Sequence, residues 1–322
     1  MQIYRSLNEL AANTTPSVVT VGNFDGVHCG HRMVIASVID RAKTVNARSV
    51  AVTFDPHPAH VLHDGPRLPL ITPLPEKLDL LAATGLDLAL VLPFDETLRH
   101  WTAREFAQRV MHDALHASEV HEGETFRFGH NAQAGVNDLS QLGNDLGFTV
   151  RAYEPFLQRG SAVSSSRIRS LLAAGSVDQA RNLLGRPFSI RSTPASGRGY
   201  GTRYAVPTIN LAPYPELLPA NGVYITTLRI GTGPDARLFR GVTNAGNRPT
   251  FGADSFAVES HLLNFIPTDL TESTPLELTF LKRLRGEQRF PTPEALRTQI
   301  GLDVRRAQRY FALCDTRSIK LG

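Results

Sequence analysis

Two histidines lie where a buried strand would give way to a helix. Residues 17–21, Ser-Val-Val-Thr-Val, have the composition of a buried strand. They are followed by the turn Gly22-Asn-Phe-Asp-Gly26 and by His28-Cys-Gly-His31, which would open a helix. The free backbone N–H groups and the dipole of a helix N-terminus bind anions, and Gly30 would let a phosphate approach the backbone closely. With two imidazoles added, this arrangement favours an enzyme that binds ATP and transfers its nucleotidyl part.

Two further segments carry groups suited to the same chemistry. Thr53-Phe-Asp-Pro-His-Pro58 ends a second strand and would bring His57 into the same crevice. Ser164-Ser-Ser-Arg-Ile-Arg169 begins a helix, where the serines can cap the helix and bind phosphate oxygens, and Arg167 or Arg169 can meet the β- and γ-phosphates. Taken alone, each segment also fits a structural role, as a proline-rich turn with a surface histidine or as a helix cap with solvated arginines.

The composition is that of a globular protein of 322 residues, with 42% hydrophobic and 20% charged residues. This length allows two domains. The net charge of +4, without a dense Lys/Arg run, fits small anionic ligands as well as nucleic acid. The only two cysteines, Cys29 and Cys314, give no disulfide framework. Because there is no signal pattern and no apolar run approaching the ~20 residues that span a bilayer, we expect a cytoplasmic protein without a membrane partner.

The first half of the chain alternates between strands and helices. Apolar strands separated by amphipathic helices predict an α/β fold with a doubly wound parallel sheet, covered on both faces. Ligands of such sheets bind beyond the carboxyl ends of the strands, where the turns after Val21 and Phe54 lie. The expected strands are 17–21, 49–54, 88–92 and 149–152, and the expected helices are 33–47, 75–84, 103–115 and 136–146.

The second half becomes rich in strands after Pro187. Two short helices, 166–174 and 177–184, precede this change. Strands separated by Gly/Pro-rich turns predict an antiparallel β-barrel or sandwich, closed by a helix over 293–314. We therefore expect one domain at residues 1–183 and another at 184–322. The expected strands of the second domain are 188–191, 222–230, 238–244, 257–263 and 276–284.

In their order along the chain, the first three segments resemble the N-terminal nucleotidyltransferase module of the bacterial bifunctional riboflavin kinase/FMN adenylyltransferase (FAD synthetase) family. The resemblance implies that His28 and His31 are catalytic. Phe126-Arg-Phe-Gly129 resembles the flavin-side loop of the family, which implies flavin contacts by Phe126 and Phe128, although Thr125 replaces the usual acidic residue. The implied ATP-binding residues of this module are Gly22, Asn23, Phe24, Asp25, His57, Ser164, Ser166 and Arg169.

The strand-rich half resembles the riboflavin kinase module of the same family. Val206-Pro-Thr-Ile-Asn-Leu211 is similar to its Pro-Thr-Ala-Asn motif, which implies that Thr208 and Asn210 hold Mg²⁺. The two residues would share one face of an extended segment, although a turn in which Thr and Asn bond their own backbone is the structural alternative. The segment 258–265 also matches the kinase pattern and offers Glu259 as the general base, for which a solvated strand glutamate is the alternative.

The remaining kinase segments are loops. The resemblance implies a phosphate lid over ATP formed by Gly197, Gly199 and Gly201, and a flavin contact by Arg248 within 244–252. Ala205-Val206 replaces the Gly-Phe that usually precedes the Pro-Thr pair. This departure leaves open a family member that only adenylylates FMN, with a degenerate kinase domain.

Riboflavin, FMN and ATP are thus the expected substrates, with FAD and pyrophosphate as products and Mg²⁺ as the cofactor of both steps. A nucleic-acid-binding protein built on an aminoacyl-tRNA-synthetase-like core is an alternative of another class. The sequence offers neither a Lys-rich loop after the sheet domain nor an anticodon-type helical domain. We therefore expect no nucleic-acid partner.

Overall fold

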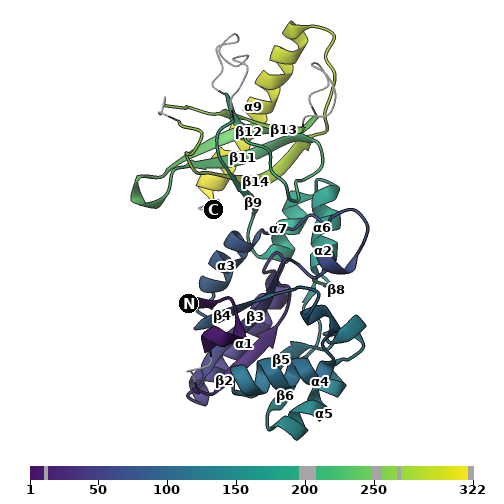
Figure 1. The fold of residues 1–322 in the computed structure, drawn as a ribbon. Helices are drawn as coiled ribbons and strands as arrows, with labels where there is room; N and C mark the ends of the chain where they lie inside the picture. Colours follow the sequence, from purple (N-terminus) through teal and green to yellow (C-terminus); the bar gives the residue numbers. More distant parts are fainter. Residues whose placement is uncertain (11–13, 196–207, 248–255, 267–269, 318–322) are drawn as a thin grey trace. The chain divides into compact units, whose positions relative to one another are not determined.

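The computed structural model divides into two compact units, residues 1–165 and 166–322 (Figure 1). It describes residues 1–10, 14–195, 208–247, 256–266 and 270–317. The division groups the two short helices after Ser165 with the second unit. The expected domain boundary between residues 183 and 184 therefore stays a prediction.

The first unit is built on a six-stranded parallel sheet with the order β1-β4-β3-β2-β5-β6. From β2, the chain places β3 and β4 on one side and β5 and β6 on the other. The topological switch point, beside which such sheets bind ligands, therefore lies between β2 and β5. The strands are β1 (Gln2–Tyr4), β2 (Ser17–Val21), β3 (Arg48–Asp55), β4 (Leu88–Pro93), β5 (Ala117–Gly123) and β6 (Thr149–Tyr153).

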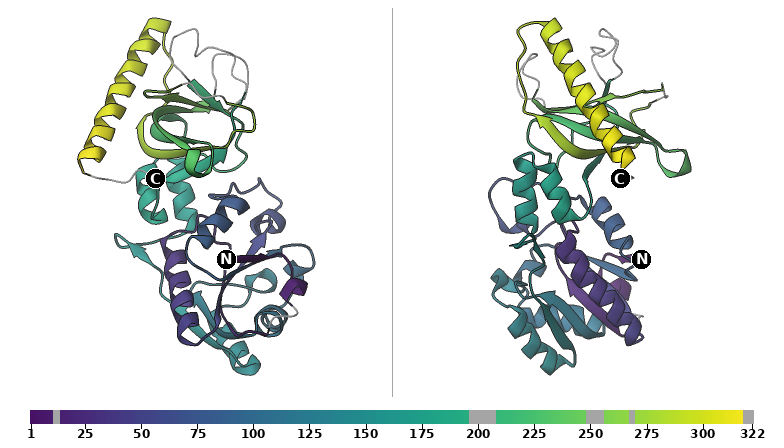
Figure 2. Two further views of the ribbon diagram at one scale, coloured as in Figure 1. Left: turned by 90° about the vertical axis from the view of Figure 1, so that its left-hand side faces the viewer. Right: turned by 180° about the vertical axis from the view of Figure 1, so that it is seen from behind.

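Helices cover both faces of this sheet, as the alternating pattern predicts (Figure 2). One face packs Val18 against Ile35 of α1 and Leu81 of α3. The other packs Val120 against Met111 and Leu139. The first unit is therefore doubly wound. Its helices are α1 (Cys29–Thr44), α2 (Ala59–Leu62), α3 (Leu74–Ala82), α4 (Ala103–Phe106) with its π-helical continuation η3 (Ala107–Ala114), and α5 (Val136–Leu146). Short 3₁₀ turns lie at Leu7–Leu10, Leu98–His100 and His130–Ala132. A small antiparallel hairpin of β7 (Leu157–Gln158) and β8 (Ser161–Ala162) follows β6.

Strand β5 was not predicted, because its polar residues hide the apolar pattern of a buried strand. Glu119 and His121 are only 6% and 1% exposed. The Glu119 carboxylate lies 2.6 Å from the guanidinium of Arg41 and 3.1 Å from that of Arg151, and it also contacts His121 at 3.3 Å. Buried charges are tolerated when they are paired in this way. Burial nevertheless lowers the pKa of His121 and favours its neutral ring.

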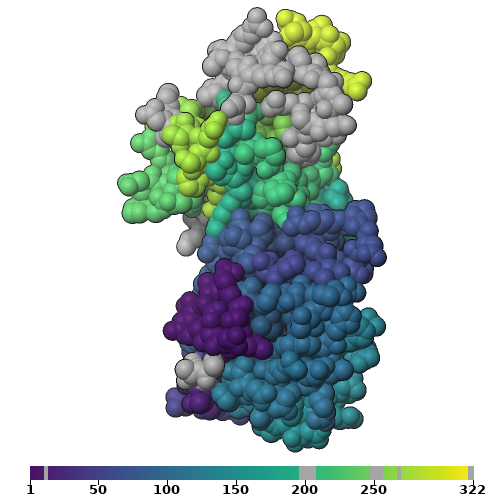
Figure 3. Space-filling model, in the orientation of Figure 1, coloured from purple at the N-terminus to yellow at the C-terminus, as the bar shows by residue number. Residues whose placement is uncertain are grey.

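The edge strand β1 was also not predicted, because it is short and mostly exposed. It pairs in parallel with β4, with Gln2 opposite Leu88. The first residues of the chain, coloured purple, form part of the surface in Figure 3. The predicted strands are thus flanked by an additional edge strand, which lies two strands away from β2.

The second unit contains a six-stranded antiparallel sheet with the order β10-β13-β12-β11-β14-β9. Its two edges meet, because Ala195 N–H donates to Asn210 O at 2.9 Å and Ala212 N–H donates to Thr193 O at 2.8 Å. The sheet therefore curls into the predicted antiparallel barrel (Figure 2). The elements are α6 (Ser165–Ala173), α7 (Val177–Leu184), β9 (Phe188–Ser192), β10 (Thr208–Leu211), β11 (Gly222–Ile230), η5 (Gly233–Asp235), β12 (Arg237–Asn247), β13 (Phe256–Leu262) and β14 (Leu276–Arg285).

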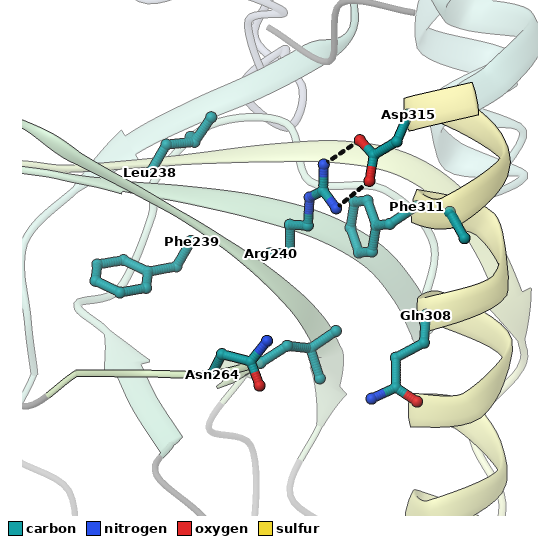
Figure 4. A pocket seen from close by; sticks show the side chains of 9 residues that line it. Leu238, Phe239, Arg240, Asn264, Gln308, Phe311 and Asp315 are labelled. Atoms are coloured by element: carbon teal, nitrogen blue, oxygen red, sulfur yellow. Dashed lines mark hydrogen bonds and ion pairs between the residues drawn. The ribbon is translucent and has the colours of Figure 1, made fainter. Parts of the chain in front are cut away.

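The closing helix is α9 (Pro293–Thr316), which packs Phe311 against the outer face of the barrel. Figure 4 shows how its last turns are held: the Arg240 guanidinium donates to both oxygens of Asp315, at 2.8 and 2.5 Å, and lies over the Phe311 ring at 4.9 Å. The hydrogen bond to Arg240 lowers the pKa of the Asp315 carboxyl. Among the described residues, no helix is long and apolar enough to cross a membrane.

The aromatic centre of the barrel generates a test of the fold. Phe280 is fully buried, with its ring centroid 5.9 Å from that of Phe188 and 5.4 Å from that of Tyr224. Phe280→Ala should lower the free energy of unfolding of the second unit by roughly 3–5 kcal/mol, because it leaves a cavity. Leu238→Ala, at a side chain that is 48% exposed, should change it by less than about 0.5 kcal/mol. Urea denaturation followed by circular dichroism checks both, and equal effects of the two substitutions would contradict this packing.

Candidate active sites

The two histidines predicted at the switch point form the start of α1. The helix begins at Cys29, four residues before the expected Met33, because His28 caps it: the His28 Nδ1 accepts the N–H of His31 at 3.3 Å. The two imidazole rings stack with their centroids 3.6 Å apart, and the Phe24 ring meets His31 edge-on at 5.2 Å. The sequence thus places two parallel imidazoles at a helix N-terminus that follows β2, one of the two strands that flank the switch point.

The environment of His31 favours its neutral form. Burial lowers the pKa of the ring well below its usual value, and the neighbouring positive charges of His28 and Lys77 lower it further. The His31 Nδ1 is buried and has no hydrogen-bond partner in the part of the chain that the structure describes. An anion close to the ring would favour its protonation. His31 is therefore suited to bind a group that brings negative charge.

Asp25, predicted to bind ATP, supports the loop from within. Its carboxylate is 2% exposed and accepts the N–H groups of Ile71 at 3.1 Å and Thr72 at 2.9 Å. The Thr72 hydroxyl in turn accepts the N–H of Gly26 at 2.9 Å. These bonds fix the turn after β2 to the segment that precedes α3. The geometry gives Asp25 a supporting position, and its contact with ATP stays a prediction.

The turn after β3 lies beside the turn after β2, as expected. The Gly22 N–H donates to Val52 O at 2.9 Å, and the Thr53 hydroxyl donates to Asn23 O at 3.3 Å. His57 follows this turn, where it is half-buried, and its Nδ1 accepts the N–H of Ala59 at 3.1 Å. The structure therefore brings the His57 segment alongside the first loop.

The serine run reaches the same loop through a residue that was not predicted. The Ser165 hydroxyl donates to Asp25 O at 2.8 Å. Ser164 precedes it in the first unit, whereas Ser166 and Arg169 belong to α6 in the second unit. The Ser165 bond lies within the first unit, and the grouping of Ser166 and Arg169 with the loop stays a prediction.

The expected flavin-side loop follows β5, across the switch point from the histidines. The rings of Phe126 and Phe128 stack with their centroids 5.3 Å apart. Phe128 is 7% exposed and belongs to the core, where its backbone pairs with that of Ala134 through bonds of 3.0 and 3.2 Å. Phe128 therefore holds the loop in place, and the half-buried Phe126 is the ring that can offer a face to a ligand.

A buried carboxyl group lies at the end of β5. Glu122 is 4% exposed, and its Oε1 accepts the N–H of Val21, the last residue of β2, at 2.5 Å. Burial raises the pKa of Glu122 well above its usual value. This side chain supplies a hydrogen bond at the point where the backbone pairing of β2 with β5 has ended at Val19 and Val120. It thereby fixes the strand end from which the histidine loop departs.

The second group of predicted residues meets on the barrel. Asn210 of β10 lies opposite Glu259 of β13, which lies opposite Asn244 of β12. Directly opposite residues share one face of a sheet, and Thr208, two positions before Asn210, lies on that face too. The segment is thus extended, as predicted, and is not a turn. The same face carries Val242, which packs with α9.

The other predicted residues of the kinase module lie outside the described residues. They are Gly197, Gly199, Gly201, the pair Ala205-Val206, and Arg248.

Comparisons with known proteins cover both units. A profile of the FAD synthetase family matches residues 10–167, and a profile of riboflavin kinases matches residues 184–311. The bifunctional riboflavin kinase/FMN adenylyltransferase of Pseudomonas fluorescens is 36% identical over 313 residues, which cover 96% of this chain and 97% of the relative. The chain belongs to this family. The enzyme of the same name from Escherichia coli K12 is 31% identical over 315 residues, 97% of this chain and 99% of the relative.

A solved structure shares the fold of this family member. The crystal structure of a macrolide-efflux protein from Streptococcus pneumoniae has a TM-score of 0.84 and 24% sequence identity, and the match covers 95% of this chain and 98% of that one. At this identity the likeness concerns the fold alone. It confirms the predicted fold class, a parallel α/β sheet domain followed by an antiparallel barrel with a closing helix.

The family resemblance did not single out Lys77, Glu122 or Ser165, which hold the first loop in the structure. Lys77 is 6% exposed on α3, on the side of the helix that also carries Leu74 and Leu81. A lysine at helical spacing within an apolar stripe is a signal that the sequence contains. For Glu122 the signal is weaker, because its strand was not predicted.

Glu122 generates a prediction about pH. In the unfolded chain its carboxyl ionises near its usual pKa, whereas the folded state raises that pKa. The stability that Glu122 contributes is therefore fully present at low pH and is lost as pH rises through the folded pKa. Glu122→Gln does not titrate, so its stability relative to the unsubstituted protein should increase from pH 5 to pH 8. Urea denaturation at both values checks this, with the exposed Glu124→Gln as a control of equal charge change. The same pH trend in both variants would contradict it.

Proposed function

We propose that this chain makes FAD in two steps. The second unit phosphorylates riboflavin with ATP to give FMN and ADP, and the first unit transfers the adenylyl group of a second ATP to FMN, with release of pyrophosphate. The observation that carries the proposal is that one chain holds both a histidine-capped helix N-terminus at a parallel-sheet switch point and the Asn210–Glu259 row on a barrel. The proposed partners are these small molecules alone, and the cytoplasm is the expected location.

In the first unit, an oxygen of the FMN phosphate attacks the α-phosphorus of ATP, and the bond to the departing pyrophosphate breaks. Negative charge develops on the α-phosphate and on the leaving group. His28 and His31, stacked at the N-terminus of α1, stabilise this charge together with the backbone N–H groups, because preorganised donors do so without reorganisation. The predicted ATP contacts of the first loop, His57, Ser164, Ser166 and Arg169 bind the remaining phosphates.

In the second unit, Glu259 accepts the proton of the terminal ribityl hydroxyl as its oxygen attacks the γ-phosphorus and ADP departs. Thr208 and Asn210 offer a hydroxyl and an amide oxygen on the same face as the carboxylate, which is the set of hard oxygen ligands that Mg²⁺ prefers. These residues fit a magnesium site. When bound there, the ion would neutralise phosphate charge.

The alternative of a degenerate kinase domain is disfavoured by this row. Asn210 and Glu259 are direct register partners, and Thr208 lies on the same face of β10. A kinase domain without catalytic activity would not require Thr208, Asn210 and Glu259 on one face of the sheet. The match of the riboflavin kinase profile to residues 184–311 supports the active form.

Product analysis tests the proposal directly. The purified chain is incubated with riboflavin, ATP and Mg²⁺, and in parallel with FMN, ATP and Mg²⁺, and the flavins are separated by chromatography. We expect FMN and FAD in the first reaction and FAD in the second. FAD from FMN alone would favour the degenerate-kinase alternative, and no product in either reaction would refute the proposed function.

Two substitutions should separate the activities. His31→Asn removes one charge-stabilising ring and should lower FAD formation from FMN by about 10²–10³-fold. Glu259→Gln removes the proton acceptor and should lower FMN formation from riboflavin by about 10²–10⁴-fold. Each variant serves as the control of the other, because the second activity should persist. Initial rates of both reactions check this, and loss of both activities in either variant would contradict the assignment of one site to each unit.

A further inference from the structure

Lys77 is a buried ammonium group that the proposed mechanism does not use. It projects from α3 and is 6% exposed. Its Nζ donates to Asn23 O at 3.2 Å, to the Thr53 hydroxyl at 3.0 Å and to Phe54 O at 3.3 Å. These three bonds use all three N–H donors of the side chain.

The acceptors come from the two turns that form the adenylyl-transfer site. Asn23 lies in the loop between β2 and the histidines, and Thr53 and Phe54 end β3 just before the His57 segment. In a trans peptide, the carbonyl and the following N–H point in opposite directions. Because Lys77 holds the carbonyl of Asn23, it also fixes the direction of the Phe24 N–H. One ammonium group thereby sets the spacing and the orientation of both turns.

The charge of Lys77 is left unneutralised. All three of its acceptors are neutral, and within the described residues no carboxylate lies in ion-pair distance of Nζ. Asp25 and Asp55 attract the ammonium group only from farther away, and the Asp25 carboxylate is already occupied by two backbone N–H groups. A buried positive charge without a partner is costly, unless a negatively charged ligand accompanies it.

We infer that Lys77 is a positioning residue for adenylyl transfer, which fixes the two turns and places a positive charge behind the loop that binds the ATP phosphates. This inference rests on the proposed function of the first unit. It gives the ammonium group a role in the strength of ATP binding and in the alignment of the α-phosphate, without direct contact with the reacting atoms.

The protonation of Lys77 should appear in the pH dependence of kcat/KM for ATP, which a purely structural role would leave unchanged. Burial lowers its pKa to about 8, against the opposing attraction of Asp25 and Asp55. Across the site, His31 of α1 faces the same charge, and its own pKa is lowered by it. The ammonium form is thus present at pH 7 and is lost above about pH 8. The kcat/KM for ATP in FAD formation should fall over this alkaline range, since that ratio reports the free enzyme.

Three variants test the inference. Lys77→Met keeps the length and removes the charge, and Lys77→Arg keeps the charge at every pH used. Lys43→Met removes an equal charge from an exposed site on α1. We expect Lys77→Met to lower kcat/KM for ATP at pH 7 by at least about 10-fold and to lose the alkaline fall. Lys77→Arg should retain more activity than Lys77→Met and should also lose the alkaline fall, whereas Lys43→Met should match the unsubstituted protein.

The second activity of the chain controls for folding. Riboflavin phosphorylation should be unchanged in all variants, because Lys77 belongs to the first unit. The inference would be overturned if kcat/KM for ATP still fell at alkaline pH in Lys77→Arg. It would also be overturned if kcat/KM for ATP of Lys77→Met at pH 7 lay within about twofold of that of the unsubstituted protein. If Lys77→Met fails to fold, the pH profiles of the unsubstituted protein and Lys77→Arg still decide. Absence of FAD formation by the unsubstituted protein would instead refute the proposed function.

Discussion

The first site depends on fixing a loop that must leave its N–H groups open to an anion. A loop that closed its own hydrogen bonds would be rigid but could not bind phosphate. Here the support comes from buried polar side chains behind the loop. Glu122 holds the N–H of Val21 where β2 ends, Asp25 bonds the backbone before α3, and Lys77 bonds the loop carbonyl of Asn23. The loop that leads to the N-terminus of α1 is thus held at three points from behind.

In the second site, strand register fixes the positions of the polar side chains. Asn210, Glu259 and Asn244 lie in one row because three antiparallel strands pair without a shift at these positions. A slip of one residue in β10 would turn Asn210 to the barrel interior and bring Ile209 to the site face. Because Ile209 is buried in the interior, such a slip would also expose an apolar side chain. The packing of the barrel thus enforces the alignment of the polar row.

The parts that could be predicted from the sequence are those with local causes. The β-branched residues of β2, the glycine-bearing turn and the two histidines act on neighbours in the chain, so the strand, the turn and a helix opened by the histidines were expected, although the expected helical range began only at Met33. The alternation on β10 gave the shared face of Thr208 and Asn210. Strand β5 escaped prediction because Glu119 is buried only by virtue of Arg41 and Arg151, which come from distant elements. The register that places Glu259 beside Asn210 is equally a property of the folded sheet.

For Lys77, the sequence indicates that the side chain is buried, but it does not indicate which groups the side chain contacts. Its place within an apolar stripe of α3 is visible in the sequence, but its acceptors lie 23 to 54 positions away. Only the folded sheet brings these acceptors together around one ammonium group.

Burial shifts the three titratable groups of this site in one sense, toward their neutral forms. It lowers the pKa of His31 and of Lys77 and raises that of Glu122. For the two bases, a bound triphosphate opposes the effect of burial, because nearby negative charge favours the protonated ring of His31 and the ammonium group of Lys77. On the proposed function, the positive charge of the site thus grows when ATP arrives. In the empty site the neutral form of His31 limits its repulsion with the Lys77 ammonium group, which stays charged at pH 7, and a bound anion would restore the charge of the ring.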